Sequence, residues 1–195
     1  MKVIIIVIIA ILFALFMIQA YTSKSSNDIE QYRYKVIKQI DEVEIRSYES
    51  AVFSSVKMSS STYEESASGG FRILAGYIFG GNETGQKIAM TSPVIMEMGD
   101  SMKMSFMVPS DQDINGLPKP NDARVFQEKK DSTVLAAIAF NGWASDEKIQ
   151  SHISELKAVL EKHQIAYEGP FSYLGYNPPY QLVNRRNEVV VRVKL

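Results

Sequence analysis

One order of predicted elements occurs twice in this chain, and it constrains the fold more than any other feature. In the first half, residues 43–48 alternate between apolar and polar side chains with the period of two that is typical of strands, and a second strand is predicted at residues 51–58. A segment with helical spacing follows and ends at Gly-Gly-Asn, residues 80–82, before two more predicted strands at residues 87–98 and 102–108. The first half is therefore predicted to contain strand, strand, helix, strand, strand.

Residues 110–122, which contain two prolines, are predicted to link this half to a second half with the same order. The strands and the helix of the second half are predicted at residues 123–128, 133–140, 145–163, 171–176 and 187–195. The repetition indicates duplicated ββαββ halves. Together they predict an α+β domain in which eight antiparallel strands and two helices form a closed or nearly closed sheet.

The helix boundaries carry their own local signals. Thr62 and Glu65 are spaced as a capping box at the start of the first helix, and Ser145 is expected to cap the second. The apolar stripe of the first helix contains Tyr63, Ala67, Phe71, Leu74 and Ile78. Gly69 and Gly70 interrupt this helix at an energetic cost, so we expect another part of the chain to approach closely there.

The N-terminus predicts the compartment. After Lys2, residues 3–18 are all apolar, and a small residue follows at Ala20, which is the composition of a signal peptide or an N-terminal membrane anchor. Either reading of residues 1–20 predicts export, with the domain membrane-anchored through residues 3–20 or released as a periplasmic or secreted protein. Residues 21–31 are predicted to be a polar tether to a domain at residues 32–195.

Composition excludes several function classes. The formal net charge is −1, so there is no basic surface from which to predict nucleic-acid binding. The chain has no cysteine, which excludes disulfides and thiolate nucleophiles. The two histidines both lie on the second predicted helix, and no HExxH, GxSxG or phosphate-binding glycine motif is present. We therefore predict that the chain is not an enzyme.

Four dispersed motifs carry a resemblance to a known family. They are EIRSY at residues 44–48, KIAMTSPV at 87–94, GYNPP at 175–179 and NRRNEV at 184–189. In order and spacing they resemble the SOUL haem-binding protein family, from about Tyr34 to the C-terminus. The resemblance implies a distorted eight-stranded antiparallel β-barrel with two helices and a pseudo-twofold between its halves. It also implies reversible, non-covalent binding of haem or another tetrapyrrole, without established catalytic chemistry.

A haem site needs an apolar cleft with Arg or Lys at its rim for the propionates. The first helix and the segment after it could supply both, and the predicted haem-binding residues are Phe71, Arg72, Leu74, Ala75, Ile78, Lys87 and Met90. Some family members have a histidine where this chain has Ser47, and a serine hydroxyl is a poor iron ligand. The axial ligand therefore stays unknown. Arg185 and Arg186 could hold a propionate, but a role in stabilising a turn is favoured.

Two other classes of ligand remain open. Met96 and Met98 are predicted to lie opposite Met102 and Met104 across a three-residue hairpin loop, and thioethers suit Cu(I), although core packing explains them as well. The related drug-sensing fold binds cationic or aromatic small molecules beside a buried carboxylate. Glu97 and Glu128 lie on predicted strands, but the alternation of side chains places Glu97 on the outward face.

Overall fold

The described part of the chain forms a curved antiparallel sheet with helices on its outer side. The computed structural model describes residues 4, 5, 7–9, 13, 17 and 29–194. Most of the predicted signal peptide or anchor at residues 1–20, and the tether up to residue 28, lie outside these residues. Within the described residues, no helix is both long and apolar enough to cross a membrane.

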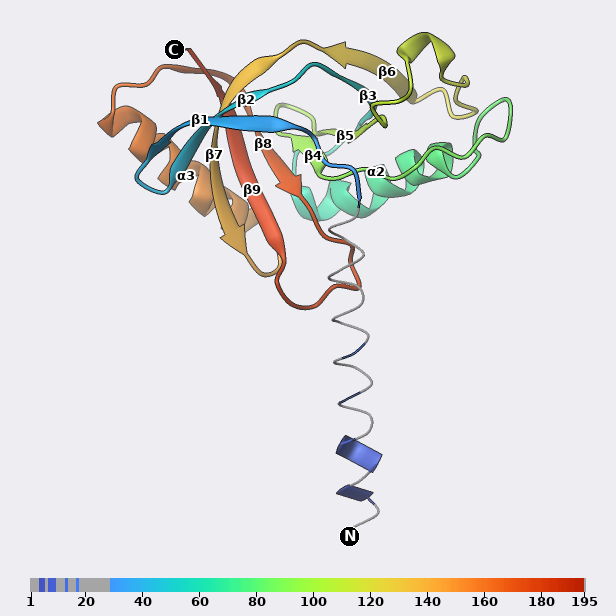
Figure 1. Ribbon diagram of the computed structural model, residues 1–195, viewed down its shortest axis with the longest axis horizontal. Helices are drawn as coiled ribbons and strands as arrows, with labels where there is room; N and C mark the ends of the chain where they lie inside the picture. The colour runs from blue at the N-terminus through green and yellow to red at the C-terminus, as the bar shows by residue number, and fades with distance from the viewer. Residues whose placement is uncertain (1–3, 6, 10–12, 14–16, 18–28, 195) are drawn as a thin grey trace.

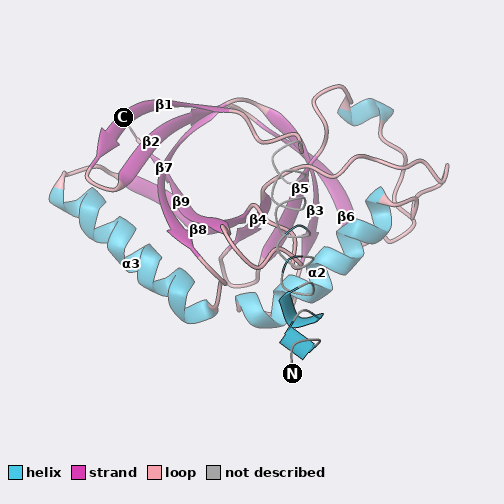
Figure 2. Ribbon diagram, turned by 60° about the horizontal axis from the view of Figure 1, so that its bottom comes forward, coloured by secondary structure: helices cyan, strands magenta, loops and turns pink. Residues whose placement is uncertain are grey.

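Within residues 29–194 the sheet has nine strands. They are β1 (Tyr34–Ile40), β2 (Val43–Tyr48), β3 (Ala51–Lys57), β4 (Val94–Glu97), β5 (Lys103–Met107), β6 (Val125–Lys130), β7 (Thr133–Asn141), β8 (Tyr167–Gly175) and β9 (Arg186–Val193). Within the same residues the helices are α2 (Tyr63–Ile78), α3 (Asp146–Lys162) and a short 3₁₀ turn, η1 (Ile114–Gly116), and Figure 1 labels α2, α3 and the strands along the chain. Figure 2 shows the strands curving around a common axis, with α2 and α3 outside the curve.

The sheet topology confirms the duplication. The strand order is β1-β2-β7-β9-β8-β4-β5-β3-β6, and every ladder is antiparallel. Exchanging the halves, so that β2 takes the place of β6, β3 of β7, β4 of β8 and β5 of β9, reverses the order of these eight strands and changes nothing else. Two copies of ββαββ therefore share one sheet, and the first strand of each half pairs with the second strand of the other half.

The ninth strand, β1, corrects the predicted count of eight. Its first six residues are exposed or half-buried, so the segment lacks the alternation that marks a half-buried strand. It is an edge strand that joins β2 through a turn at Asp41, whose φ is 51°. In the described residues β1 and β6 are the two ends of the sheet, which curves like a barrel but does not close.

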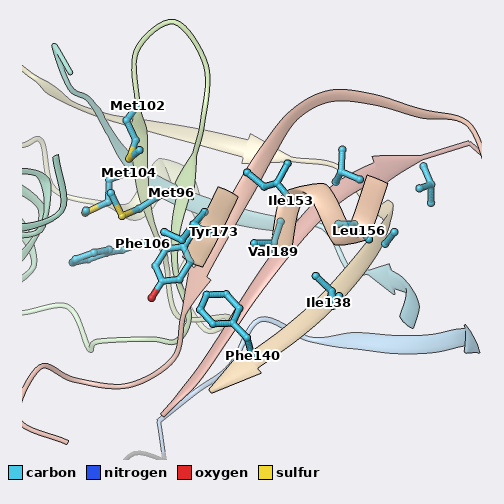
Figure 3. Packing of buried hydrophobic residues seen from close by; sticks show 14 of the residues in the cluster. Met96, Met102, Met104, Phe106, Ile138, Phe140, Ile153, Leu156, Tyr173 and Val189 are labelled. Atoms are coloured by element: carbon cyan, nitrogen blue, oxygen red, sulfur yellow. The ribbon is translucent and has the colours of Figure 1, made fainter. Parts of the chain in front are cut away.

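Both faces of the sheet carry buried apolar side chains. Helix α2 packs on β3 and β5, and α3 packs on β7 and β9. The main core fills the space between helices and sheet and includes residues from both halves, as Figure 3 shows: Met96, Met104, Phe106, Ile138, Leu156 and Val189. A second cluster lies on the other, concave face and consists of Tyr32, Tyr48, Phe53, Ile95, Met107, Ala137, Leu174, Tyr176 and Val190.

The methionine hairpin and the two helical glycines meet in the main core. Met96 lies directly opposite Met104 in the β4–β5 ladder, and both are buried. A Cβ atom at Gly70 would lie 3.2 Å from the Met104 thioether, and one at Gly69 would lie 3.2 Å from Met58, so the predicted close approach is confirmed. The loop is longer than predicted, since the last paired residues are Glu97 and Lys103.

The predicted strand at residues 87–98 begins only at Val94. Pro93 has no N–H to donate to a ladder, and the residues before it are held by other partners. The Ile88 amide donates to the Ile78 carbonyl at the end of α2 (2.8 Å). The Thr91 hydroxyl donates to the Met107 carbonyl (2.6 Å). The segment is therefore held by the end of α2 and by β5, and it does not extend the sheet.

The two helix N-termini meet, and one helix caps the other. The predicted capping box at Thr62 is wrong, because the Thr62 side chain accepts no hydrogen bond from the helix. Instead, the Asp146 carboxylate accepts hydrogen bonds from the amides of Tyr63 (2.7 Å) and Glu64 (3.1 Å). The cap of α3 is as predicted, since Ser145 accepts a hydrogen bond from the Lys148 amide.

Candidate functional site

The outer face of α2 presents aromatic side chains to solvent beside a cation. Phe71 is 36% exposed and Phe79, the residue just after the helix, is 63% exposed. Ala75 lies between them at the i, i+4, i+8 spacing that places three residues on one face of a helix. Arg72 is exposed beside this row. A Cβ atom at Gly76 would meet nothing within 4 Å, so the surface is open there.

The predicted haem-binding residues divide into two groups. Phe71, Arg72 and Ala75 lie on this outer face, whereas Leu74 and Ile78 are buried in the core between α2 and the sheet. The Phe71 ring also contacts the buried Phe106 ring edge-on at 5.3 Å between centroids, so the outer face is anchored to the core. The structure therefore places three of these five helix residues where a ligand could contact them.

The segment after α2 places the remaining two predicted residues near the end of the helix. Asn82 fixes the turn, because its side-chain amide donates to the carbonyls of Tyr77 (3.2 Å) and Gln86 (2.7 Å). Lys87 follows and is exposed, and Met90 is half-buried against the core. Phe79 is the residue that the sequence analysis missed on this surface. The sequence spacing could have identified Phe79, since it continues the four-residue spacing of Phe71 and Ala75 beyond the end of the helix.

The histidines lie on the other helix and have partners there. His152 stacks on Phe140 with 4.2 Å between ring centroids, and its Nδ1 lies 2.7 Å from the Lys148 carbonyl. His163 is the C-cap of α3 and its Nε2 lies 3.1 Å from an Asp41 carboxylate oxygen. In the described residues, no cluster of three or more His, Asp or Glu side chains is placed to hold a metal ion. Neither imidazole faces the surface of α2.

The EIRSY and NRRNEV motifs build a buried ionic network on the concave face. Arg46 on β2 donates to both carboxylate oxygens of Glu188 on β9, at 2.7 and 3.1 Å. Glu188 is fully buried and also accepts hydrogen bonds from Arg186 and from the Tyr176 hydroxyl (2.8 Å). The Arg46 guanidinium also lies over the Tyr34 ring, 4.3 Å from its centroid. The side chains of these motif residues therefore connect β1, β2 and β9.

Burial and charge act in opposite directions on Glu188. Burial alone would raise the pKa of this carboxyl, but the hydrogen bonds and positive charges of Arg46 and Arg186 hold the pKa below its usual range. The carboxylate is therefore the stable form at neutral pH. Burial lowers the pKa of both guanidinium groups, but their pairing with Glu188 outweighs it and leaves the pKa of each above its usual range.

Arg185 and the GYNPP motif stabilise the connection between β8 and β9. The Arg185 guanidinium donates to the carbonyls of Pro178 (2.9 Å) and Gln181 (2.7 Å) and lies over the Trp143 ring. The Asn177 side chain accepts a hydrogen bond from the Arg186 amide. The favoured interpretation of the two arginines, as stabilisers of this turn, agrees with these contacts.

The position of Glu97 differs from the predicted outward, solvent-facing position. Glu97 was assigned to the outward face because it alternates with Met96 and Met98, but the face opposite these methionines is the concave face of the sheet. There Glu97 lines a cavity of about 490 Å³. Glu128 is paired on the same face, since Lys103 lies 3.4 Å from Glu97 and 3.2 Å from Glu128.

The fold defines a class of protein: duplicated α+β domains in which a curved antiparallel sheet carries one helix of each half on its outer side. The chain belongs to the SOUL heme-binding protein family, whose model matches residues 29–192. It is 34% identical to heme-binding protein 2 of Mus musculus and 32% identical to heme-binding protein 2 of Homo sapiens. Each match spans 155 residues and covers 75% of this chain and 75% of the relative.

Solved structures show the same fold at much lower identity. The C-terminal domain of EcmrR superposes with a TM-score of 0.59 at 8% identity, covering 83% of this chain and 98% of that domain. A structure of SAV2435 bound to tetraphenylphosphonium superposes with a TM-score of 0.50 at 14% identity, covering 78% of this chain and 94% of that one. At these identities the likeness describes the fold alone.

Proposed function

We propose that this chain binds haem or a related tetrapyrrole non-covalently and reversibly on the outer face of α2, and that it is not an enzyme. Membership of a heme-binding family and relatives named as heme-binding proteins support the ligand class. The observation that carries the location is the pair of exposed rings, Phe71 and Phe79, on either side of Ala75 with Arg72 beside them.

The surface fits the ligand in both of its chemical parts. The flat apolar macrocycle would lie across the phenyl rings and over Gly76, where an added Cβ atom would meet nothing within 4 Å. The propionates would accept charge-assisted hydrogen bonds from Arg72 and Lys87. With both histidines on α3, we expect affinity to come from apolar burial and propionate contacts, with Met90 or water as a weak iron ligand.

Titration of the purified full chain with hemin, followed by the Soret band, tests this proposal. We expect Arg72→Gln to weaken binding by roughly 10- to 150-fold, since a hydrogen bond to a charged group contributes about 1.5–3 kcal/mol. Lys87→Gln should act in the same direction. His152→Ala and His163→Ala should leave the Soret maximum unchanged.

Lys162→Gln is the matched control, because Lys162 is an exposed cation paired with Asp41 at 2.8 Å in the last turn of the other helix, α3. It should not alter hemin affinity. If His163→Ala shifts the Soret maximum while Arg72→Gln has no effect, the ligand binds at α3 and the proposed location is wrong.

We also propose that the domain is exported, either anchored by residues 3–20 or released after Ala20. The apolar run after Lys2 supports this proposal. N-terminal sequencing of the membrane and soluble fractions distinguishes the two forms. A mature protein that begins at Met1 in the cytosolic fraction would refute both.

A further inference from the structure

The concave face of the sheet encloses a cavity that is separate from the outer face of α2. Its volume is about 490 Å³, within the range of small-molecule sites. Its apolar lining comes from both halves of the fold and from the segment before β1: Tyr32, Tyr48, Ile95, Leu135, Leu174 and Val190. The sheet separates this cavity from α2, because the helices pack on the opposite face (Figure 2).

The mouth of the cavity is cationic. A more open hollow of about 650 Å³ shares Glu97, Lys130, Thr133 and Arg192 with the cavity, so the two form one depression. The charged residues lining this hollow are four cations and two carboxylates: Lys103, Lys129, Lys130, Arg192, Glu97 and Asp131. An apolar interior below a mouth with excess positive charge matches an anion with an apolar body.

Glu97 and Glu168 both lie closer to other cations than to Lys130 and Arg192. Glu97 lies 3.4 Å from Lys103, and Glu168 lies 2.6 Å from Lys194. Among the described residues Arg192 has no ion pair or hydrogen bond from its side chain, although Glu168 lies opposite it in the β8–β9 ladder, and Lys130 pairs with Glu97 only at 3.8 Å.

The charges around Lys130 support the same reading. Burial lowers the pKa of Lys130, and the positive charges of Lys103 and Arg192 lower it further, while Glu128 and Glu97 act in the opposite direction. An incoming anion would relieve this repulsion between like charges.

We propose that this depression is a second ligand site, selective for amphipathic anions in which a carboxylate or sulfonate contacts Lys130 and Arg192 and an apolar body enters the cavity. The opposite charge preference would need an excess of carboxylates, whereas the cavity and the hollow together are lined by four cations and three carboxylates. The site does not depend on the haem site, because the two lie on opposite faces of the sheet.

Fluorescence titration of the full chain with 8-anilinonaphthalene-1-sulfonate tests the proposal. Binding to the apolar segment at residues 3–18 is common to all variants, so the difference between variants is the measured quantity. Arg192→Gln should weaken binding by about 10-fold, and Arg72→Gln, the matched change on α2, should leave it unchanged. Ser172→Phe, which places a ring in the cavity from a half-buried position on β8, should abolish it.

Competition experiments define the ligand class. Dodecanoate and 2-naphthoate should displace the probe, and the more effective of the two identifies an alkyl or an aromatic body. Dodecyltrimethylammonium, with the same chain and the opposite charge, should not displace it. Displacement by this cation, or full binding by Ser172→Phe, would overturn the proposal.

Hemin titration of the same variants separates this site from the haem site. Ser172→Phe should bind hemin as the parent chain does. If Ser172→Phe instead loses both hemin and the sulfonate probe, the cavity is the haem site and no second site exists. If Arg72→Gln loses hemin while Arg192→Gln loses the probe, both proposals hold.

Discussion

Replacing Glu188 by glutamine tests whether the buried ionic network holds the sheet together. The substitution keeps the shape of the side chain but removes the charge that faces Arg46 and Arg186. Arg46 would then keep only Glu44 as an ionic partner, 2.7 Å from its Nε, and Glu44 is partly exposed. The change therefore leaves a buried guanidinium without its main counter-charge, which is the costly case for a buried ion pair.

The expected loss follows from that geometry. Removing one partner of a buried pair costs about 3–5 kcal/mol, and we expect about 3 kcal/mol because Glu44 remains beside Arg46. For a chain of this length that corresponds to a fall in Tm of roughly 6–12 °C. Urea denaturation and scanning calorimetry would measure both quantities.

The pH dependence gives a second test of the same residue. The folded-state pKa of Glu188 is lowered, so its contribution is present above the unfolded pKa of about 4.3 and is lost as the pH falls through the folded pKa. The difference in stability between the parent chain and Glu188→Gln should therefore be constant at neutral pH and shrink below about pH 4.

Glu83→Gln is the matched control. Glu83 forms a solvent-exposed pair with Lys119 at 3.3 Å, and such pairs contribute at most about 1 kcal/mol. If Glu188→Gln costs no more than Glu83→Gln, the network does not stabilise the fold.

Two further predictions concern α2. Gly81→Ala should destabilise the domain by more than about 1 kcal/mol, because the added Cβ atom would lie 2.6 Å from the Gly76 carbonyl oxygen. Gly76→Ala should instead stabilise it by about 0.5–1 kcal/mol. Equal effects of the two substitutions in urea denaturation would contradict this prediction. Asp146→Ala should lower the stability of the domain by about 1 kcal/mol and speed hydrogen exchange at the Tyr63 amide. Thr62→Ala should leave that exchange rate unchanged. The reverse result would show that Thr62 caps the helix.

Much of the fold followed from local patterns. The period-2 runs, the stripe of α3 and the Ser145 cap were recognisable because each depends on residues a few positions apart. The repeated order of elements predicted the duplication that the strand order confirms. β1 was missed because an exposed edge strand has no buried face to impose alternation on its residues.

The candidate site was only partly predictable for a related reason. Helical spacing placed Phe71 and Leu74 in one stripe, but the stripe is wider than the contact with the sheet, so Leu74 is buried and Phe71 stays on the surface. The alternation of Met96 and Glu97 assigned them to opposite faces correctly. It could not show that the sheet curves and encloses a cavity on the side of Glu97.

The sequence by itself determined the element order, the duplication and the family, because periodicity and motifs are properties of neighbouring residues. Only the tertiary structure decided that Asp146 caps a helix 83 positions away and that Arg46 meets Glu188 across 142 positions. Those pairs depend on which strands become neighbours and how far the sheet curves. Both are set by burying all the apolar faces at once, which no local segment specifies.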